Sequence, residues 1–309
     1  MDIPVLSIVI PTYNEAGHLQ RALAEIAHHA RSTNVPYEIV IVNDGSTDST
    51  WELLRASAEK DAAIKAIKLS RNFGKEAAIT AGLRYAKGSA VILMDCDLQH
   101  PPALIPVMVD AWKKGSVDIV EAVKQERGSE TLSYKIGARV FYWMMRRLAH
   151  LQIDNASDFK LLDRKVVDAF NRLHESARFF RGIVSWLGFR KVQVSFSVPD
   201  GVARKTRWSF VRLINLALNA ATAFTSLPLH IVTLLGVITF VFSVLLGIQT
   251  LYMKFSGAAV TGFTTVILLL LFIGSVLMIS LGIIGLYISR IFEEVKKRPI
   301  YIEEDTINL

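Results

Sequence analysis

Two carboxylates stand one residue apart in the segment Asp95-Cys96-Asp97, directly after a short apolar run that ends at Met94. If this run is a strand, Asp95 and Asp97 point to the same side, because successive side chains of a strand alternate between faces. Two unpaired carboxylates repel each other, and a hard divalent cation with oxygen ligands relieves the repulsion. The spacing predicts a site for Mg²⁺ or Mn²⁺ completed by substrate phosphates. The alternative is that both carboxylates cap helices.

Two earlier loops carry amide, hydroxyl and acidic side chains directly after apolar runs of their own. They are Pro11-Thr12-Tyr13-Asn14-Glu15 and Asn43-Asp44-Gly45-Ser46-Thr47-Asp48. At the carboxyl edge of a sheet, such groups are able to hydrogen-bond a base and a ribose. Turns prefer the same residue types, so turn and capping chemistry is an equal alternative for either loop taken alone.

Two side chains beside the carboxylates are interpreted as structural. Cys96 is expected to face away from its acidic neighbours as a small buried apolar residue, and His100 is assigned to the turn rather than to a ligand set. Cys96 is also the only cysteine of the chain, which excludes an intrachain disulfide and fits a reducing compartment.

The elements that must position these loops follow from the periodicity of the chain. Short β-branched runs predict strands, and the longer amphipathic segments between them predict helices. Strands that alternate with helices indicate an α/β fold with a doubly wound, mostly parallel sheet, which binds ligands at the carboxyl ends of its strands. The predicted strands cover residues 6–10, 37–42, 64–69, 90–94 and 118–123, and the predicted helices cover 15–31, 50–60, 75–87 and 102–114.

Local signals refine these elements. The residues Ser49-Thr50-Trp51-Glu52 have the pattern of a capping box, and Pro101-Pro102 opens the fourth helix. Residues 125–200 are less regular and are interpreted as the second half of the same domain. A helix is expected there over 131–149, with short strands near 159–162 and 191–198.

The last third of the chain has the composition of a membrane segment. The protein is 51% hydrophobic, and only Lys254 is charged between Arg212 and Arg290. Residues 231–248 and 266–288 are each long enough to cross a hydrocarbon core. The residues between them, including Lys254, are expected to form the turn of a helical hairpin. Two buried core helices are the weaker alternative.

The excess of basic residues fits a membrane surface better than a nucleic acid. The net charge is +7, and basic clusters around Arg204 and Lys297 flank the uncharged region. By the positive-inside bias, both flanks lie in the cytoplasm. Residues 208–223 have helical spacing typical of an interface helix, with a soluble core helix as the alternative. The N-terminus lacks the pattern of a cleaved signal peptide, so the soluble domain is expected to stay in the cytoplasm.

Four parts are therefore predicted along the chain. They are a cytoplasmic α/β domain over 1–203, juxtamembrane amphipathic helices over 204–228, a transmembrane hairpin over 229–290 with spans at about 231–252 and 264–288, and a cytoplasmic tail over 291–309.

Several motifs together resemble family 2 glycosyltransferases of the GT-A fold. These motifs are the two loops described above, Arg71-Asn72-Phe73-Gly74-Lys75 before Ala81-Gly82, and Asp95-Cys96-Asp97-Leu98-Gln99. Further motifs resemble the polyprenyl-phosphate glycosyltransferases, a group with bactoprenol glucosyltransferases and dolichyl-phosphate mannose synthases. These are Asp97-Leu98-Gln99-His100-Pro101-Pro102, Ser157-Asp158-Phe159-Lys160-Leu161-Leu162-Asp163, Arg181-Gly182 before Trp186-Leu187-Gly188, and the two-helix C-terminus. The resemblance covers nearly the whole chain.

The resemblance implies a role for each matching position. The nucleotide would be held by Pro11, Tyr13, Glu15 and Asp44, and the metal and diphosphate by Asp95 and Asp97 with Gln99 close by. Asp158 matches the catalytic carboxylate, with a loop cap as its alternative. The chain departs from the group at Thr206-Arg207-Trp208, where relatives often have Ser-Lys-Tyr or Ser-Lys-Trp. Arg and Lys bind phosphate differently, which puts the geometry of that contact in doubt.

The implied reaction is the inverting transfer of a hexose, glucose in the nearest group, from a UDP-sugar to undecaprenyl phosphate at the cytoplasmic face of the inner membrane. A phosphomonoester has a second pKa near about 6 and is already largely ionised. Asp158 is therefore expected to position the attack or balance charge. Loss of pH dependence in an Asp158→Asn enzyme that keeps most of its activity would support this, and a fall by several orders of magnitude would favour obligatory chemistry. Candidates for binding the acceptor phosphate are Lys124, Arg127, Arg139, Arg204 and Arg207, each with a solvated basic face as its alternative.

Other readings stay open or fail on particular residues. GDP-mannose or another UDP-sugar is the alternative donor, and a non-catalytic membrane scaffold is the alternative class, against which the intact Asp95, Asp97 and Asp158 argue. A nicotinamide dehydrogenase needs a glycine-rich turn where Pro11-Thr12-Tyr13 stands. A processive polysaccharide synthase needs more than two spans. The resemblance also implies a homo-oligomer such as a tetramer, and a flippase and a second glycosyltransferase that use the product for O-antigen or cell-envelope glycan modification.

Overall fold

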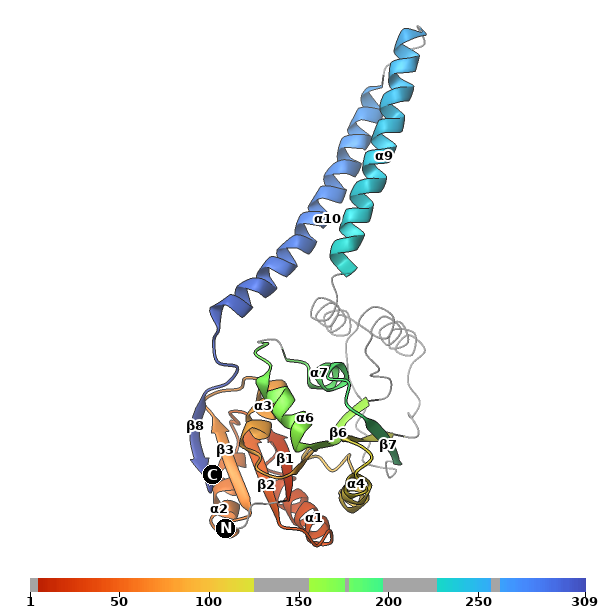
Figure 1. Cartoon of the computed structure of the whole chain (residues 1–309). Coiled ribbons are helices and arrows are strands. Elements are labelled where there is room, and N and C mark those ends of the chain that lie inside the picture. The colour runs from red at the N-terminus through yellow and green to blue at the C-terminus, as the bar shows by residue number, and fades with distance from the viewer. Residues whose placement is uncertain (1–4, 125–155, 176–177, 197–226, 257–261) are drawn as a thin grey trace. The chain divides into compact units, whose positions relative to one another are not determined.

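The computed structural model of the chain describes residues 5–124, 156–175, 178–196, 227–256 and 262–309 (Figure 1). The helices expected over 131–149 and 208–223 lie outside these ranges. The chain divides into two compact units, of which the first holds a sheet with its helices and the second holds two long apolar helices.

A mixed sheet of eight strands forms the centre of the first unit. Its strands are β1 (Leu6–Thr12), β2 (Tyr37–Asn43), β3 (Ile64–Leu69), β4 (Ala90–Leu93), β5 (Ile119–Lys124), β6 (Ala156–Asp163), β7 (Lys191–Phe196) and β8 (Glu303–Ile307). The order across the sheet is β7-β5-β6-β4-β1-β2-β3-β8. Strand β1 is parallel to β2 and β4, β2 to β3 and β5 to β7, whereas β6 and β8 pair antiparallel to their neighbours. The predicted α/β fold with a mostly parallel sheet is confirmed.

Helices join the strands of this unit. They are α1 (Leu19–Arg31), α2 (Thr50–Ala58), α3 (Lys75–Tyr85), α4 (Leu104–Lys113), α6 (Arg164–Arg172) and α7 (Phe180–Trp186). The first four were predicted, with starts and ends that differ by a few residues. The predicted capping box is wrong, because the Ser49 side chain makes no cap at α2, and Asp48 Oδ1 accepts the hydrogen bond from the Thr50 N–H at 3.1 Å instead.

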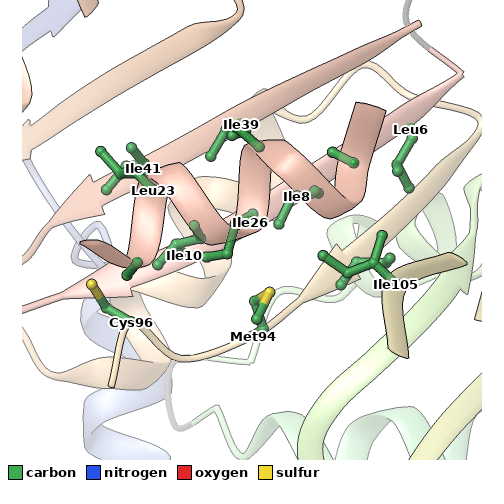
Figure 2. Close-up of a cluster of buried hydrophobic side chains, with 14 of the residues drawn as sticks. Leu6, Ile8, Ile10, Leu23, Ile26, Ile39, Ile41, Met94, Cys96 and Ile105 are labelled. Carbon is green, nitrogen blue, oxygen red and sulfur yellow. The ribbon is translucent and has the colours of Figure 1, made fainter. Parts of the chain in front are cut away.

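The hydrophobic core explains why the strands in the first half of the sheet could be predicted from the sequence. Ile8 and Ile10 of β1 lie on one face, because side chains two residues apart in a strand share a side. Leu23 and Ile26 of α1 pack there beside Ile41 of β2 (Figure 2). All five are buried, and each buried side chain of this size stabilises the fold by about 1.5–3 kcal/mol.

The second unit contains α9 (Leu227–Phe255) and α10 (Phe263–Lys296). Val232–Phe255 and Leu269–Lys296 are candidate membrane spans with mean hydropathies of 2.2 and 2.6. Large apolar side chains such as Phe240 and Leu281 are more than half exposed, as expected of helices that face lipid. One expectation is corrected: Lys254 lies in the last turn of α9 and not in the connecting turn, because the helix continues to Phe255.

The tail that follows α10 completes the sheet of the first unit, where β8 pairs with β3 (Figure 1). Lys68 Nζ of β3 lies 2.9 Å from Glu304 Oε1. The Asn308 side chain donates to the backbone oxygens of Ala58 at 2.7 Å and Ile64 at 3.0 Å. This strand was not predicted from the sequence, because its acidic residues lack the apolar alternation of a half-buried strand.

Deletion of residues 303–309 is expected to lower the melting temperature of the first unit by roughly 5 °C, since several backbone and Asn308 hydrogen bonds are lost together. Thermal unfolding of the detergent-solubilised chain, followed by tryptophan fluorescence, measures this. The matched control is the pair Glu304→Gln and Asp305→Asn, which removes only exposed charges and should change the melting temperature little. A deletion variant as stable as the full chain would show that β8 contributes nothing.

Candidate active site

The two carboxylates that suggested a metal site stand in a turn after β4. The strand ends at Leu93, so Asp95 and Asp97 are not strand residues, and the argument from alternating strand faces is wrong. The turn is bent at Leu98, which has a φ of 56°. The Gln99 N–H donates to Asp97 Oδ1 at 3.1 Å and closes this bend. The backbone of the turn therefore sets the directions of the carboxylates.

Cys96 lies between them and is 3% exposed, as expected. Burial, with a smaller contribution from the nearby carboxylates, raises the pKa of the Cys96 thiol to about 12. A thiol of this kind is a neutral apolar group rather than a nucleophile.

Asp158 lies on β6, the antiparallel neighbour of β4. The last printed pair of the β4–β6 register is Leu93 with Lys160, and beyond it Asp95 and Asp158 both contact Lys75. Asp158 Oδ1 accepts from Arg181 Nε at 2.6 Å, and Oδ2 accepts from Arg181 Nη2 at 3.0 Å and from Lys75 Nζ at 2.8 Å. Burial alone would raise the pKa of Asp158, but Arg181 and Lys75 hold it well below its usual range. Asp158 is therefore an ionised carboxylate and a weak base.

Lys75 joins the two carboxylate positions. It is the first residue of α3, and its Nζ lies 2.6 Å from Asp95 Oδ1 as well as 2.8 Å from Asp158 Oδ2. Burial would lower the pKa of Lys75, but the charges of Asp95 and Asp158 raise it above its ordinary value. The structure thus brings Asp95, Asp158, Lys75 and Arg181 together in one cluster, named here the carboxylate–cation cluster.

Arg181 reaches this cluster from α7, which Glu76 of α3 holds in place. The Phe180 N–H donates to Glu76 Oε2 at 2.8 Å. Burial raises the pKa of Glu76 to about 7, although this hydrogen bond opposes the change. The first turns of α3 and α7 are thereby tied together on either side of Asp158.

The raised pKa of Glu76 predicts a pH dependence of stability. Because its folded-state pKa lies above the unfolded value of about 4.5, the stability that protonated Glu76 contributes is present below pH 4.5 and lost as the pH rises toward 7. The melting temperature of the wild-type chain should therefore fall between about pH 5 and pH 8 more steeply than that of a Glu76→Gln variant. Melting curves across this range compare the two slopes, and equal slopes would contradict the assignment.

His100 lies closer to the cluster than its assignment to the turn suggested. Its ring stacks on Phe159 with centroids 5.2 Å apart, and its Nδ1 lies 3.9 Å from Asp95 Oδ2. Burial lowers the pKa of His100, so the ring is neutral at neutral pH. A neutral, stacked imidazole forms one wall beside Asp95.

The loop after β2 is built around Asp44. Its Oδ1 accepts from the Phe73 N–H at 2.7 Å and its Oδ2 from the Gly74 N–H at 2.9 Å. Burial raises the pKa of Asp44 despite these donors. Gly45 follows with a φ of 63°, and a Cβ there would lie 2.3 Å from the backbone carbon of Arg71. Asp44 and Gly45 therefore set the path of the loop that leads into α3 and Lys75.

The loop after β1 is bound to the loop after β2. The Thr47 N–H donates to Asn14 Oδ1 at 2.9 Å, and the Asn14 N–H donates to Ser46 Oγ at 2.9 Å. Turn chemistry, the alternative interpretation, thus accounts for these groups. The remaining predicted nucleotide residues lie along the same edge. They are Pro11 in β1, Tyr13, which is 44% exposed, and Glu15, whose N–H donates to Thr50 Oγ1 at 3.0 Å.

The donor set of this edge fits Mg²⁺ or Mn²⁺. Asp95 and Asp97 supply carboxylate oxygens, and Gln99 adds an amide in the same turn. Within the described ranges, no group of three or more His, Cys, Asp or Glu side chains is gathered for a metal ion. A cation that takes one or two carboxylates together with substrate phosphates matches this set.

All of the predicted acceptor-binding side chains fall outside the part of the chain whose side chains the structure describes. Lys124 is the last residue of β5, but the structure does not describe its side chain. The other four candidates lie outside the described ranges; they are Arg127, Arg139, Arg204 and Arg207. The sequence motifs quoted above contain Lys75 and Arg181 but assigned them no role. Their charge gave no signal of its own, because a lysine at a helix start and an arginine before a glycine are common on solvated surfaces.

Comparison with known proteins gave matches over nearly the whole chain. Residues 7–170 match the model of Glycosyl transferase family 2. An uncharacterized glycosyltransferase of Synechocystis sp. is 40% identical over 305 residues, 97% of this chain and 95% of that protein. The bactoprenol glucosyl transferase of Shigella phage SfII is 34% identical over 302 residues, 96% of each chain. A prophage bactoprenol glucosyl transferase homolog of Escherichia coli K12 is 33% identical over 302 residues, 96% of this chain and 97% of that one.

Proposed function

Because the chain belongs to Glycosyl transferase family 2, we propose that it transfers glucose from UDP-glucose to undecaprenyl phosphate, with inversion, at the cytoplasmic face of the inner membrane. The observation that carries the proposal is the carboxylate–cation cluster, in which Lys75 joins Asp95 to Asp158. The match to the phage bactoprenol glucosyl transferase supports the acceptor, because it covers 96% of this chain, including the apolar helices.

The state of Asp158 supports a mechanism without an obligatory general base. The acceptor phosphate has a second pKa near about 6 and is largely ionised at neutral pH. Asp158, paired with Arg181 and Lys75, is a weak base whose pKa is lowered. Its carboxylate therefore positions the cations and balances charge, while the acceptor oxygen attacks the anomeric carbon opposite the leaving diphosphate.

The leaving group determines what the other residues do. Mg²⁺ or Mn²⁺ at Asp95 and Asp97, when bound, would stabilise the negative charge that develops on the nucleoside diphosphate. Tyr13 and Asp44 would hold the base at the edge of β1 and β2. Lys75 lies beside Asp95 and adds a positive charge to the same region. Each of these groups stabilises charge that grows as the glycosidic bond breaks.

The apolar helices support a membrane location for this chemistry. Each of α9 and α10 is long and apolar enough to cross a bilayer. With the basic flanks on the cytoplasmic side, the product would form in the cytoplasmic leaflet. It then needs a flippase and a second glycosyltransferase, and we propose both as partners of a homo-oligomeric enzyme.

A donor panel tests the proposal. Purified chain in detergent is incubated with undecaprenyl phosphate, Mg²⁺ or Mn²⁺, and radiolabelled UDP-glucose, other UDP-sugars or GDP-mannose, and label in the lipid phase is counted. Label from UDP-glucose alone, abolished by Asp97→Ala, is expected. Label from GDP-mannose would show that GDP-mannose, and not UDP-glucose, is the donor. An inactive chain that still binds UDP with metal would favour another acceptor, and one that binds no nucleotide would favour the scaffold.

A further inference from the structure

Lys75 occupies an unusual position for a lysine at the start of a helix. Its ammonium is shared between Asp95 Oδ1 at 2.6 Å and Asp158 Oδ2 at 2.8 Å. In the proposed function these two carboxylates have different roles, because Asp95 binds the metal with the donor diphosphate whereas Asp158 positions cations and balances charge. One cation therefore touches both halves of the site.

Among the charged groups of the cluster, Lys75 is the one best able to change partners. Arg181 is committed to Asp158 through two N–H groups. The side chain of Lys75 is 43% exposed, whereas that of Asp158 is 9% exposed. A lysine is also a point charge on a flexible stem, without the fixed fork geometry of arginine. Lys75 can therefore leave one carboxylate while it keeps the other.

The place of Lys75 conflicts with a divalent cation at Asp95. The ammonium lies 2.6 Å from Asp95 Oδ1, so a metal ion that binds the same carboxylate comes within a few ångströms of another positive charge. Like charges at that separation repel strongly in a partly desolvated site. The metal and Lys75 therefore compete for Asp95.

We propose that Lys75 is a positioning residue that neutralises Asp95 in the free enzyme, gives Asp95 up when the divalent cation enters with the nucleotide, and then remains with Asp158 and the donor diphosphate. The proposal rests on the proposed function for its assignment of the diphosphate. Its consequence is a coupling between two ligands. A nucleotide that draws Lys75 away from Asp95 raises the affinity for the metal, and by linkage the metal raises the affinity for the nucleotide equally.

The position of Lys75 also links this coupling to the nucleotide loop. Lys75 follows Gly74, whose N–H is held by Asp44 at 2.9 Å. The residue that anchors the predicted nucleotide loop thus fixes the start of the helix that carries Lys75. A nucleotide bound at Asp44 would act on a backbone only one residue from this lysine.

Manganese binding to the full chain in detergent tests the proposal without any sugar or acceptor. Free Mn²⁺ is measured by electron paramagnetic resonance, with and without UDP, for the wild type, Lys75→Met and Lys75→Arg. Lys113→Met, at an exposed position of α4, is the matched control. In the absence of UDP, Lys75→Met is expected to bind Mn²⁺ about tenfold more tightly than the wild type, because the competing charge is gone. Lys75→Arg and Lys113→Met should bind it as the wild type does.

The second expected result concerns the coupling. UDP should increase the Mn²⁺ affinity of the wild type by a larger factor than that of Lys75→Met, even though Lys75→Met turns over more slowly. Equal or weaker binding of Mn²⁺ by Lys75→Met without UDP would overturn the proposal. The same gain in Lys75→Arg would also overturn it, because the charge would then not be the cause. The first result, Mn²⁺ binding without nucleotide, depends on neither the donor nor the acceptor. If the donor panel identifies GDP-mannose, the coupling is measured with GDP in place of UDP, so a wrong sugar or acceptor does not by itself overturn the proposal.

Discussion

An Asp158→Asn variant should lose turnover by on the order of 100-fold while keeping the shape of its pH profile. The loss is expected because the carboxylate, 9% exposed, neutralises both Arg181 and Lys75, and an amide leaves these two cations without their shared counterion. Breaking a buried pair from one side costs about 3–5 kcal/mol, which is large enough for such a fall even if Asp158 moves no proton. The size of the loss alone therefore does not distinguish positioning from base catalysis, contrary to what the sequence suggested.

The pH profile makes that distinction, and its outcomes are the reverse of the expectation from the sequence, because the pH-dependent limb belongs to the acceptor phosphate. The rate should rise with pH around about 6, where the acceptor phosphate loses its second proton, in the wild type and in Asp158→Asn alike. The pKa of Asp158 is lowered from its ordinary value, so its own titration lies well below this limb. Initial rates from pH 5 to pH 8.5 with saturating lipid acceptor provide the comparison. If the limb disappears in the variant, Asp158 is the base and the positioning role is wrong.

The largest loss of stability is expected from Glu121→Ala, which breaks a buried ion pair of the sheet. Glu121 of β5 faces Lys160 of β6 across the sheet, and their side chains, 3% and 4% exposed, form a buried ion pair. The alanine leaves the Lys160 ammonium buried and uncompensated, which costs about 3–5 kcal/mol. For a domain of this size, the melting temperature should fall by roughly 10 °C. Tryptophan fluorescence during heating of the detergent-solubilised chain measures the change.

A double variant separates the buried charge from the packing. Glu121→Met together with Lys160→Met removes both charges and keeps similar side-chain volume, so its melting temperature should return close to that of the wild type. If the double variant is as unstable as Glu121→Ala, packing rather than the unpaired ammonium explains the loss. A Glu121→Ala chain as stable as the wild type would show that the pair contributes nothing.

The part of the fold nearest the N-terminus could be predicted because burial in the sheet determines which residue types its strands contain. Strands β1, β2 and β3 are buried β-branched runs, and their predicted bounds differ from the structure by at most two residues. By contrast, α7 is only seven residues long and has no side-chain cap, so its pattern is too short to stand out. Strand β8 is acidic and pairs at the edge of the sheet, where burial does not dictate the sequence.

In the site, too, some residues could be predicted from the local sequence and others could not. The spacing of Asp95 and Asp97 was enough to predict them as site residues, although a turn and not a strand sets the directions of their side chains. Asp158 was reached only through the family resemblance, because one carboxylate at the start of a strand has no distinctive pattern. The partnership of Lys75 with two carboxylates depends on which strands are neighbours in the sheet. The antiparallel placement of β6 beside β4 is a tertiary fact that local periodicity does not contain.

The central claim, inverting transfer of glucose to a lipid phosphate, is tested most directly by the linkage in the product. The lipid formed from UDP-[1-¹³C]glucose and undecaprenyl phosphate is extracted and examined by ¹³C and ³¹P nuclear magnetic resonance. The account predicts coupling between the anomeric carbon and phosphorus, with the β configuration that inversion of the α-linked donor gives, and no product from undecaprenol. An α-linked product, or glucose transferred to an acceptor without phosphate, would contradict it.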